Sequence, residues 1–175
     1  MDVFLQMDAN FLLWIQENLR QDFLTPFWTG ITSLGDGGWF WLALSLLLTV
    51  FPKTRKVGLL ALCSMALCAL VTNVCLKNLI ARPRPYTQIP GLTPLIPPQK
   101  DWSFPSGHTT ASFACAGIYW RMLPKKYGIA ALVLAFLITF SRLYVGVHYP
   151  TDVLAGLIIG LLGSWIVYKL YRHIR

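Results

Sequence analysis

Long apolar runs, separated by short polar segments, dominate the pattern of positions along this chain. The clearest runs cover about residues 38–51, 57–80, 106–122, 128–145 and 152–170. Several of them approach or exceed the roughly 20 residues that a helix needs to cross a bilayer. Because the runs are continuous rather than alternating, a closed membrane barrel does not fit them. The pattern therefore predicts an all-α fold, an integral membrane helical bundle.

The first part of the chain has a different pattern, in which apolar and polar residues alternate with helical spacing over residues 2–20. An amphipathic helix that lies in the membrane interface fits this spacing. Its apolar face would carry Phe4, Leu5, Phe11, Leu12, Ile15 and Leu19. Residues 23–34 are too short to span alone, so we expect a second short helix or a segment that dips into the bilayer. The bundle then has about five spanning helices, or about six if this segment crosses.

Residues 82–104 form a long proline-rich stretch between two of the apolar runs. The stretch contains Pro83, Pro85, Pro90, Pro94, Pro97 and Pro98. Proline lacks the backbone N–H that a helix requires, so we expect a loop without helix here. The length fits one domain over residues 1–175, in which residues 1–35 supply the interfacial and short helices.

The composition excludes an ordinary soluble domain. Hydrophobic residues make up 55% of the chain, charged residues only 13%, and the formal net charge is +8. Such a charge is also typical of nucleic-acid binding, but the basic residues here lie in short loops between apolar runs. We therefore expect the lipid bilayer as a partner and no nucleic acid. Cys63, Cys68, Cys75 and Cys115 lie inside apolar runs, where we expect small buried residues.

The distribution of charge indicates which side of the membrane each loop faces. The turns at 52–56 and 121–127 and the C-terminal tail carry Lys and Arg and no acidic residue, whereas all 7 acidic residues fall on the other side. The positive-inside rule assigns the basic side to the cytoplasm. We therefore expect a multi-pass protein of the cytoplasmic (inner) membrane, with residues 82–104 facing the periplasm or the cell exterior.

The same topology brings polar residues that are far apart in the sequence to one membrane face. Charged or titratable groups at the ends of membrane helices are costly and usually functional. We therefore interpret this face as the functional site. The candidate catalytic residues are His148, His108 and Asp152, and the candidate phosphate-binding residues are Lys77, Arg84, Ser106, Gly107 and Arg142.

The binding residues suit a multiply charged anion such as phosphate. Arg guanidinium groups match phosphate oxygens in pairs, and a lysine adds a point charge. Ser106 is a candidate N-cap, and Gly107 lets the backbone N–H groups of a helix start approach an anion closely. The cluster offers one carboxylate, Asp152, and no nearby cysteine, so we expect neither a metal ion nor a cofactor.

Two histidines give the site its expected reactivity. His148 and Asp152 are four residues apart, so they would share one face of a helix if both were helical. Pro150 suits the first turn of a helix, however, so His148 would precede the helix and the contact could be made across a turn. A carboxylate that accepts from one ring nitrogen leaves the other as a nucleophile, and His108 would protonate the leaving oxygen. Taken singly, each residue also has a plain interpretation: His148 as an interfacial anchor, His108 as a helix cap, and Lys77 as a side chain extending to the interface.

Three motifs in this region resemble those of the type 2 phosphatidic acid phosphatase family, which shares its site with vanadium haloperoxidases and glucose-6-phosphatase. The motifs are a lysine, six residues and Arg-Pro; Pro-Ser-Gly-His; and Ser-Arg, five residues, His, three residues and Asp. They lie in this order at residues 77–85, 105–108 and 141–152. The spacing of the first motif selects Arg84 rather than Arg82, to which we assign no role.

The resemblance implies a lipid phosphatase that works through a phosphohistidine. His148 would be the nucleophile, Asp152 its orienting partner and His108 the acid, while the binding residues named above would hold the phosphoryl oxygens. The implied substrate is a phosphate or pyrophosphate ester of a membrane lipid. Undecaprenyl pyrophosphate is the first candidate, with phosphatidylglycerol phosphate, phosphatidic acid and lipid A phosphate as alternatives. A lipid phosphotransferase and a non-catalytic anion or lipid binder stay open, as does the oligomeric state.

Overall fold

A computed structural model describes residues 3–174, and every regular element in this range is helical. Met1, Asp2 and Arg175, which fall in the predicted first helix and basic tail, lie outside the described residues. The helices are α1 (Val3–Asn18), α2 (Thr25–Ser33), α3 (Trp39–Val50), α4 (Arg55–Ala69), α5 (Lys77–Ile80), α6 (Pro85–Gln88), α7 (Gly107–Met122), α8 (Lys125–Tyr144) and α9 (Pro150–Ile174). A 3-10 turn, η1 (Asp36–Gly38), precedes α3, and a π-helical segment, η2 (Leu70–Leu76), joins α4 to α5. The predicted all-α bundle is confirmed for this part of the chain.

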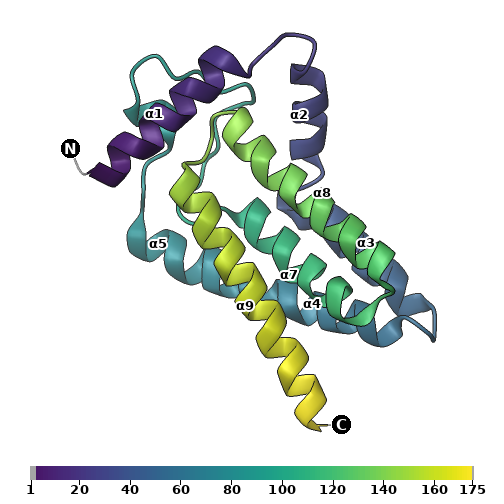
Figure 1. Cartoon of the computed structure of the whole chain (residues 1–175). Coiled ribbons are helices and arrows are strands. Elements are labelled where there is room, and N and C mark those ends of the chain that lie inside the picture. Colours follow the sequence, from purple (N-terminus) through teal and green to yellow (C-terminus); the bar gives the residue numbers. More distant parts are fainter. Residues whose placement is uncertain (1–2, 175) are drawn as a thin grey trace.

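Helix α7 forms the centre of the bundle and packs against α4, α8 and α9 (Figure 1). Its side chains are buried almost without interruption from Thr109 to Tyr119. Glycines allow α9 to approach closely: a Cβ added at Gly156 would lie 2.7 Å from the backbone oxygen of Ser106, and one at Gly160 would lie 2.7 Å from that of Thr110. This packing holds the starts of α7 and α9 beside each other.

Three helical stretches are long and apolar enough to cross a membrane, namely Arg55–Gln88, Lys125–Tyr144 and Pro150–Ile174. The pair α2 and α3, which is bent by 44°, gives a fourth if it is counted as one span. Helix α7 has only 16 residues and lies among the others. The chain is thus a membrane protein, and the expected count of about five or six crossings stays a prediction.

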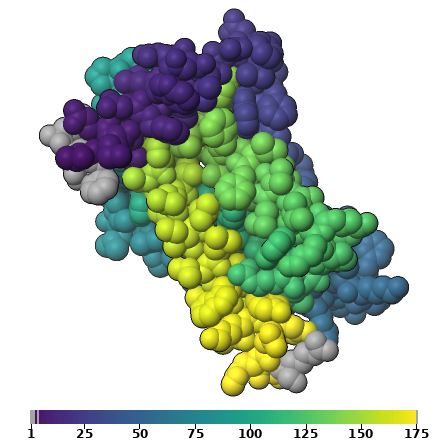
Figure 2. All heavy atoms as spheres, viewed as in Figure 1, coloured from purple at the N-terminus to yellow at the C-terminus, as the bar shows by residue number. Residues whose placement is uncertain are grey.

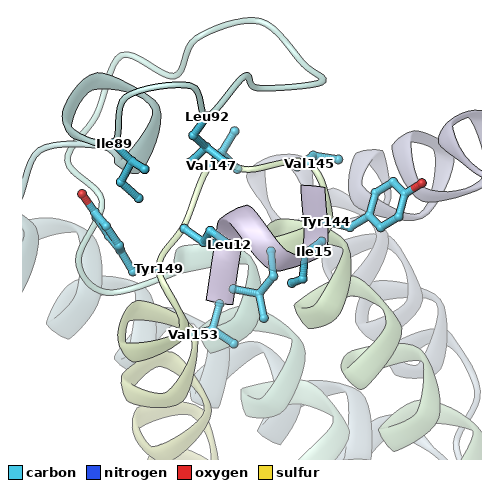
Figure 3. Close-up of a cluster of buried hydrophobic side chains, with 10 residues drawn as sticks. Leu12, Ile15, Ile89, Leu92, Tyr144, Val145, Val147, Tyr149 and Val153 are labelled. Carbon is cyan, nitrogen blue, oxygen red and sulfur yellow. The ribbon is translucent and has the colours of Figure 1, made fainter. Parts of the chain in front are cut away.

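Helix α1 lies across the end of the bundle at which α9 begins (Figures 1 and 2). Leu12 and Ile15 are buried in a cluster with Val147 and neighbouring side chains of the loops beneath them (Figure 3). Phe11 and Trp14, in contrast, are exposed on the outer side of the helix. The predicted single apolar face is therefore divided between the protein core and the surface. A position of this surface in the membrane interface stays a prediction.

Two local expectations are wrong. The proline-rich stretch does contain a helix, because Pro85 occupies the first position of α6, where a missing N–H costs nothing. Two of the cysteines, Cys63 and Cys75, are exposed rather than buried. The outer surface of a membrane bundle is as apolar as its interior, so an apolar run does not tell the two apart. The short helix expected within residues 23–34 is present as α2.

Candidate functional site

The sequence-predicted site residues gather where α7 and α9 begin and α8 ends. The backbone N–H of Ser106 donates to the carbonyl of Asp152 at 3.1 Å, which joins the starts of the two helices. Arg84 reaches the same place from the loop after α5, and its Nη1 lies 2.9 Å from His148 Nε2. Residues separated by up to 75 positions in the sequence (Lys77 to Asp152) therefore share one end of the bundle.

The ring of His148 is held from both sides in the turn before α9. Its Nδ1 lies 3.4 Å from Asp152 Oδ2, and its Nε2 lies 2.9 Å from Arg84 Nη1. Because a guanidinium can only donate, Nε2 is the acceptor, and we assign the ring hydrogen to Nδ1. Burial and the charge of Arg84 lower the pKa of His148 well below its usual value. The ring is therefore neutral at pH 7, with the Nε2 lone pair directed toward the cations of the site.

Asp152 is completely buried and accepts several hydrogen bonds. Ser103 Oγ donates to Oδ2 at 2.5 Å, and the backbone N–H of Tyr149 donates to the same oxygen at 3.0 Å. Asp152 stands in the first turn of α9, which begins at Pro150, whereas His148 precedes the helix. Of the two arrangements left open by the sequence, the contact across the turn is therefore the one observed.

The cations of the site are buried to a degree that is unusual for charged side chains. Lys77 is 7% exposed, Arg84 5% and Arg142 1%. Arg142 donates from Nη1 to Thr32 Oγ1 at 2.7 Å, but its buried Nε has no hydrogen-bond partner among the described residues. A buried donor without a partner is costly, which makes Arg142 a candidate for contact with an anion.

Asp101 adds a second carboxylate that the sequence pattern did not reveal. It forms an ion pair with Lys77 and accepts from Arg84 Nη2 at 2.6 Å. Partial burial alone would raise the pKa of Asp101, but the hydrogen bonds and charges of Lys77 and Arg84 outweigh it and lower the pKa to about 2. The expectation of a single clustered carboxylate is thus wrong, because the proline-rich loop folds back over the cations.

His108 also has an acidic partner that sequence reasoning missed. Its Nε2 lies 2.9 Å from Oδ1 of Asp36, which belongs to η1. The signal in the sequence was the glycine run around Asp36. A Cβ added at Gly35 would lie 2.5 Å from the His108 ring, so only glycine allows this approach. With the Nε2 hydrogen directed to Asp36, Nδ1 is the ring nitrogen that this contact leaves free.

The start of α7 has the features of an anion site. Ser106 caps the helix, since its Oγ accepts from the N–H of Thr109 at 3.4 Å. A Cβ added at Gly107 would lie 3.8 Å from Lys77 Nζ, so the open backbone of this turn stands beside a cation. Unpaired N–H groups at a helix start and a nearby ammonium together attract an anion.

A cavity of about 930 Å³ leads to these groups. Its polar end is formed by residues that include Asp36, Lys77, Asp101 and His108. Its other end runs between α3 and α4 and is lined by Leu42, Leu62, Met65, Ala66 and Ala69. Of the predicted site residues, Arg84, Ser106, Arg142, His148 and Asp152 are not among those that line the cavity. Within residues 3–174 no three His, Cys, Asp or Glu side chains gather in a way that would hold a metal ion.

The arrangement is that of a helical membrane protein with a buried cluster of cations, histidines and carboxylates at one end of its bundle, beside a cavity. Residues 58–175 match the PAP2 superfamily, and the chain belongs to this family. The match covers the three motifs from which the family resemblance was inferred.

Individual relatives agree with this assignment. The chain is 37% identical over 126 residues to an undecaprenyl-diphosphatase of Sulfolobus acidocaldarius, which covers 72% of this chain and 59% of that protein. It is 36% identical over 163 residues to phosphatidylglycerophosphatase B of Bacillus subtilis, which covers 85% of this chain and 76% of that protein. The crystal structure of a transmembrane PAP2-type phosphatidylglycerolphosphate phosphatase from Bacillus subtilis superimposes with a TM-score of 0.83 at 31% identity, over 100% of this chain and 89% of the other. The chain thus spans less than two thirds of the first relative's length.

Proposed function

We propose that this protein is a lipid phosphatase that hydrolyses a phosphate or pyrophosphate ester of a membrane lipid without a metal ion. The observation that carries the proposal is the environment of His148. Its neutral ring directs the Nε2 lone pair toward a cluster of buried cations. A nucleophile beside preorganised positive charge is the arrangement that phosphoryl transfer requires.

In the first half of the proposed reaction, His148 Nε2 attacks the phosphorus atom and forms a P–N bond. The bond from phosphorus to the leaving oxygen breaks, and His108 gives its Nδ1 proton to that oxygen; the ring takes up this proton from the phosphate when the substrate binds, while its Nε2 hydrogen stays directed to Asp36. Asp152 accepts from Nδ1 of His148 and stabilises the positive charge that develops on the ring. Lys77, Arg84, Arg142 and the start of α7 at Ser106 and Gly107 hold the phosphoryl oxygens, whose charge is spread in the transition state.

In the second half, water attacks the phosphohistidine. His108, now without its proton, accepts one from the attacking water, and the P–N bond breaks to release inorganic phosphate. His148 returns to its neutral state, and His108 again carries the proton. The same two residues serve both halves, as microscopic reversibility of general acid and base roles allows.

For the substrate, we propose undecaprenyl pyrophosphate as the leading candidate. The similarity to a named undecaprenyl-diphosphatase supports this choice. The cavity also has an apolar end, between α3 and α4, that suits a lipid chain. Phosphatidylglycerol phosphate is the alternative, since a relative with broader coverage is named as a phosphatidylglycerophosphatase. Transfer of the phosphoryl group to a second lipid instead of water would use the same residues.

The proposal is tested by phosphate release from the purified, detergent-solubilised protein across these candidate lipids. We expect orthovanadate, which mimics the transferring phosphoryl group, to inhibit and EDTA to have no effect. His148→Ala should abolish release, whereas His173→Ala, in the exposed tail, should not change it. Undiminished release by His148→Ala would overturn the mechanism. Loss of lipid phosphate without free inorganic phosphate would instead indicate a phosphotransferase.

A further inference from the structure

Arg82, to which the family motif gives no role, lies at the centre of a network on the buried side of the catalytic residues. Its Nη1 donates to Asp152 Oδ1 at 2.6 Å and to Thr151 Oγ1 at 2.7 Å. Its Nη2 donates to Asp8 Oδ2 at 2.8 Å. The guanidinium also stacks on Tyr149, with its central carbon 3.7 Å from the ring centroid. Every one of these partners except Asp8 belongs to the segment that contains His148.

Asp8 comes from helix α1, at the other end of the chain. Its side chain is only 4% exposed, and it turns toward the protein with Leu12 and Ile15. Besides Arg82, Asp8 accepts from the backbone N–H of Thr151 at 3.2 Å and from its Oγ1 at 2.5 Å. The carboxylate therefore holds both Arg82 and the first turn of α9.

Apolar packing around this network ties the same two parts of the chain together. Leu12 and Ile15 of α1 share a buried cluster with Val147, Tyr149 and Val153, which flank His148 and Asp152 (Figure 3). Helix α1 thus covers the catalytic turn with apolar contacts and reaches its carboxylate through Asp8 and Arg82.

We propose that Arg82 is a positioning residue, which holds Asp152 against His148 and, through Asp8, makes helix α1 part of the catalytic site. The inference rests on the proposed phosphatase reaction. Asp152 is fully buried, and a buried carboxylate keeps its place and charge only when cations and donors surround it. Arg82 is the only lysine or arginine in the described chain that forms an ion pair with it.

The geometry separates this role from that of Arg84. Arg82 neither lines the cavity nor contacts a ring nitrogen of either histidine, and both of its terminal nitrogens are occupied. Its loss should therefore affect the chemical step rather than the binding of phosphate. In kinetic terms kcat falls while KM stays nearly the same.

The experiment compares Arg82→Gln, Arg82→Lys and Asp8→Asn in the full-length protein. Arg82→Gln should lower kcat by about 10- to 100-fold, the range found for outer-shell residues that orient metal-binding histidines and carboxylates. Arg82→Lys should recover part of the loss, since lysine restores the charge but cannot reach two carboxylates with a fork. Arg172→Gln and Glu17→Gln, which change exposed residues of α9 and α1, are the matched controls and should keep full activity.

Binding of orthovanadate distinguishes positioning from misfolding. Its stoichiometry and affinity should be unchanged in Arg82→Gln, because the phosphate-binding groups stay in place. A loss of binding sites in proportion to kcat would overturn the inference, as would a KM that rises by the same factor as kcat falls. Adding Arg82→Gln to Asp152→Asn should lower kcat little further. If the two substitutions instead lowered kcat in a fully additive way, Arg82 would not act through Asp152.

Failure of the proposed function gives a different result. In that case the wild-type protein itself releases no phosphate from any lipid. The network is then judged by the unfolding midpoints of Asp8→Asn, Arg82→Gln and the double variant. If the double variant loses less stability than the sum of the two single variants, the connection between α1 and the catalytic turn is supported. Losses of stability that add fully would overturn it.

Discussion

The carboxylate of Asp101 contacts the cations to which the proposed mechanism binds a phosphate. It bridges Lys77 and Arg84, both of which the proposed mechanism uses to hold phosphoryl oxygens. Asp101 lines the cavity, whereas His148 does not and is only 1% exposed. An entering phosphate must therefore displace this carboxylate from the cations, and the cost of doing so opposes binding.

Removing the charge of Asp101 should tighten the binding of anions. For Asp101→Asn we expect the Kd of orthovanadate to fall by about 2- to 5-fold, which corresponds to the roughly 0.5–1 kcal/mol of a half-exposed ion pair. Because the pKa of Asp101 is about 2, the carboxylate is ionised at any ordinary assay pH. The tightening should then be equal at about pH 5 and about pH 8.

The matched control for this prediction is Asp22→Asn, an exposed acidic residue far from the cations in sequence. It should leave vanadate affinity unchanged and so report any general effect of net charge. Weaker binding in Asp101→Asn would contradict the prediction, because it would mean that the carboxylate organises Lys77 and Arg84 for the phosphate rather than competing with it.

Single residues differ in how far the sequence reveals them. Lys77, His108 and His148 could be identified because fixed spacings set them at the ends of apolar runs. Asp36 and Asp101 could not, since each is an ordinary polar residue in a loop until the chain brings it to its partner. Asp36 and His108, for instance, are 72 positions apart. Such contacts depend on how the loops fold back, which no local pattern records.

At the scale of elements, the contact between α7 and α9 fixes the site. Gly156 faces Ser106 and Gly160 faces Thr110, so the two backbones approach without side chains between them. Small residues at such a contact are typical of membrane helices, which associate by close packing rather than by the hydrophobic effect. The start of α7 carries His108, and the start of α9 carries Asp152, so a shift of one helix changes the distances within the site.

Gly156→Ala should disturb both stability and activity. The added Cβ meets a backbone oxygen at 2.7 Å, which cannot move as a flexible side chain would. We expect a loss of about 1–3 kcal/mol in the free energy of unfolding, as for other overpacked sites, together with a lower kcat. Thermal unfolding in detergent and phosphate release measure the two effects.

Gly30→Ala is the control for this substitution, because nothing lies within 4 Å of a Cβ at that position of α2. It should be neutral or stabilising, since alanine favours a helix more than glycine does. Equal losses in the two variants would contradict the argument, because they would show that the bundle responds to a lost glycine anywhere and not to the contact with Ser106.

The helices that were predicted correctly from the sequence are those with a long, continuous apolar pattern. The long helices α8 and α9 lie within a few residues of the apolar runs that predicted them, because continuous apolar length directly reports a membrane helix. The π-helical segment η2 was not distinguished within the predicted run 57–80, and the short helix α6 was missed. Segments this short leave no periodicity to detect. In α1, the division of apolar residues between core and surface depends on the loops it covers, which lie more than 60 residues away.

At the scale of the whole molecule, charge is distributed unevenly between the two ends of the bundle. The end that carries the site contains acidic residues such as Asp101, whereas the start of α8, at the opposite end, carries Lys125 and Lys126 without an acidic neighbour. The positive-inside rule then predicts that the site faces away from the cytoplasm. This orientation is also the one in which a lipid phosphate of the outer leaflet can reach the cavity.

Single cysteines at the two ends test this orientation. In a variant without the native cysteines, Lys100→Cys lies at an exposed position of the proline-rich loop, and Lys126→Cys lies at an exposed position in the first turn of α8. We expect a membrane-impermeant maleimide to label Lys100→Cys in intact cells, and to label Lys126→Cys only after the membrane is permeabilised. The reverse pattern would place the site in the cytoplasm, and a substrate of the inner leaflet would then replace the one proposed here. Because the two positions are exposed and lie at opposite ends of the same bundle, the pair decides the orientation whichever number of helices crosses the membrane.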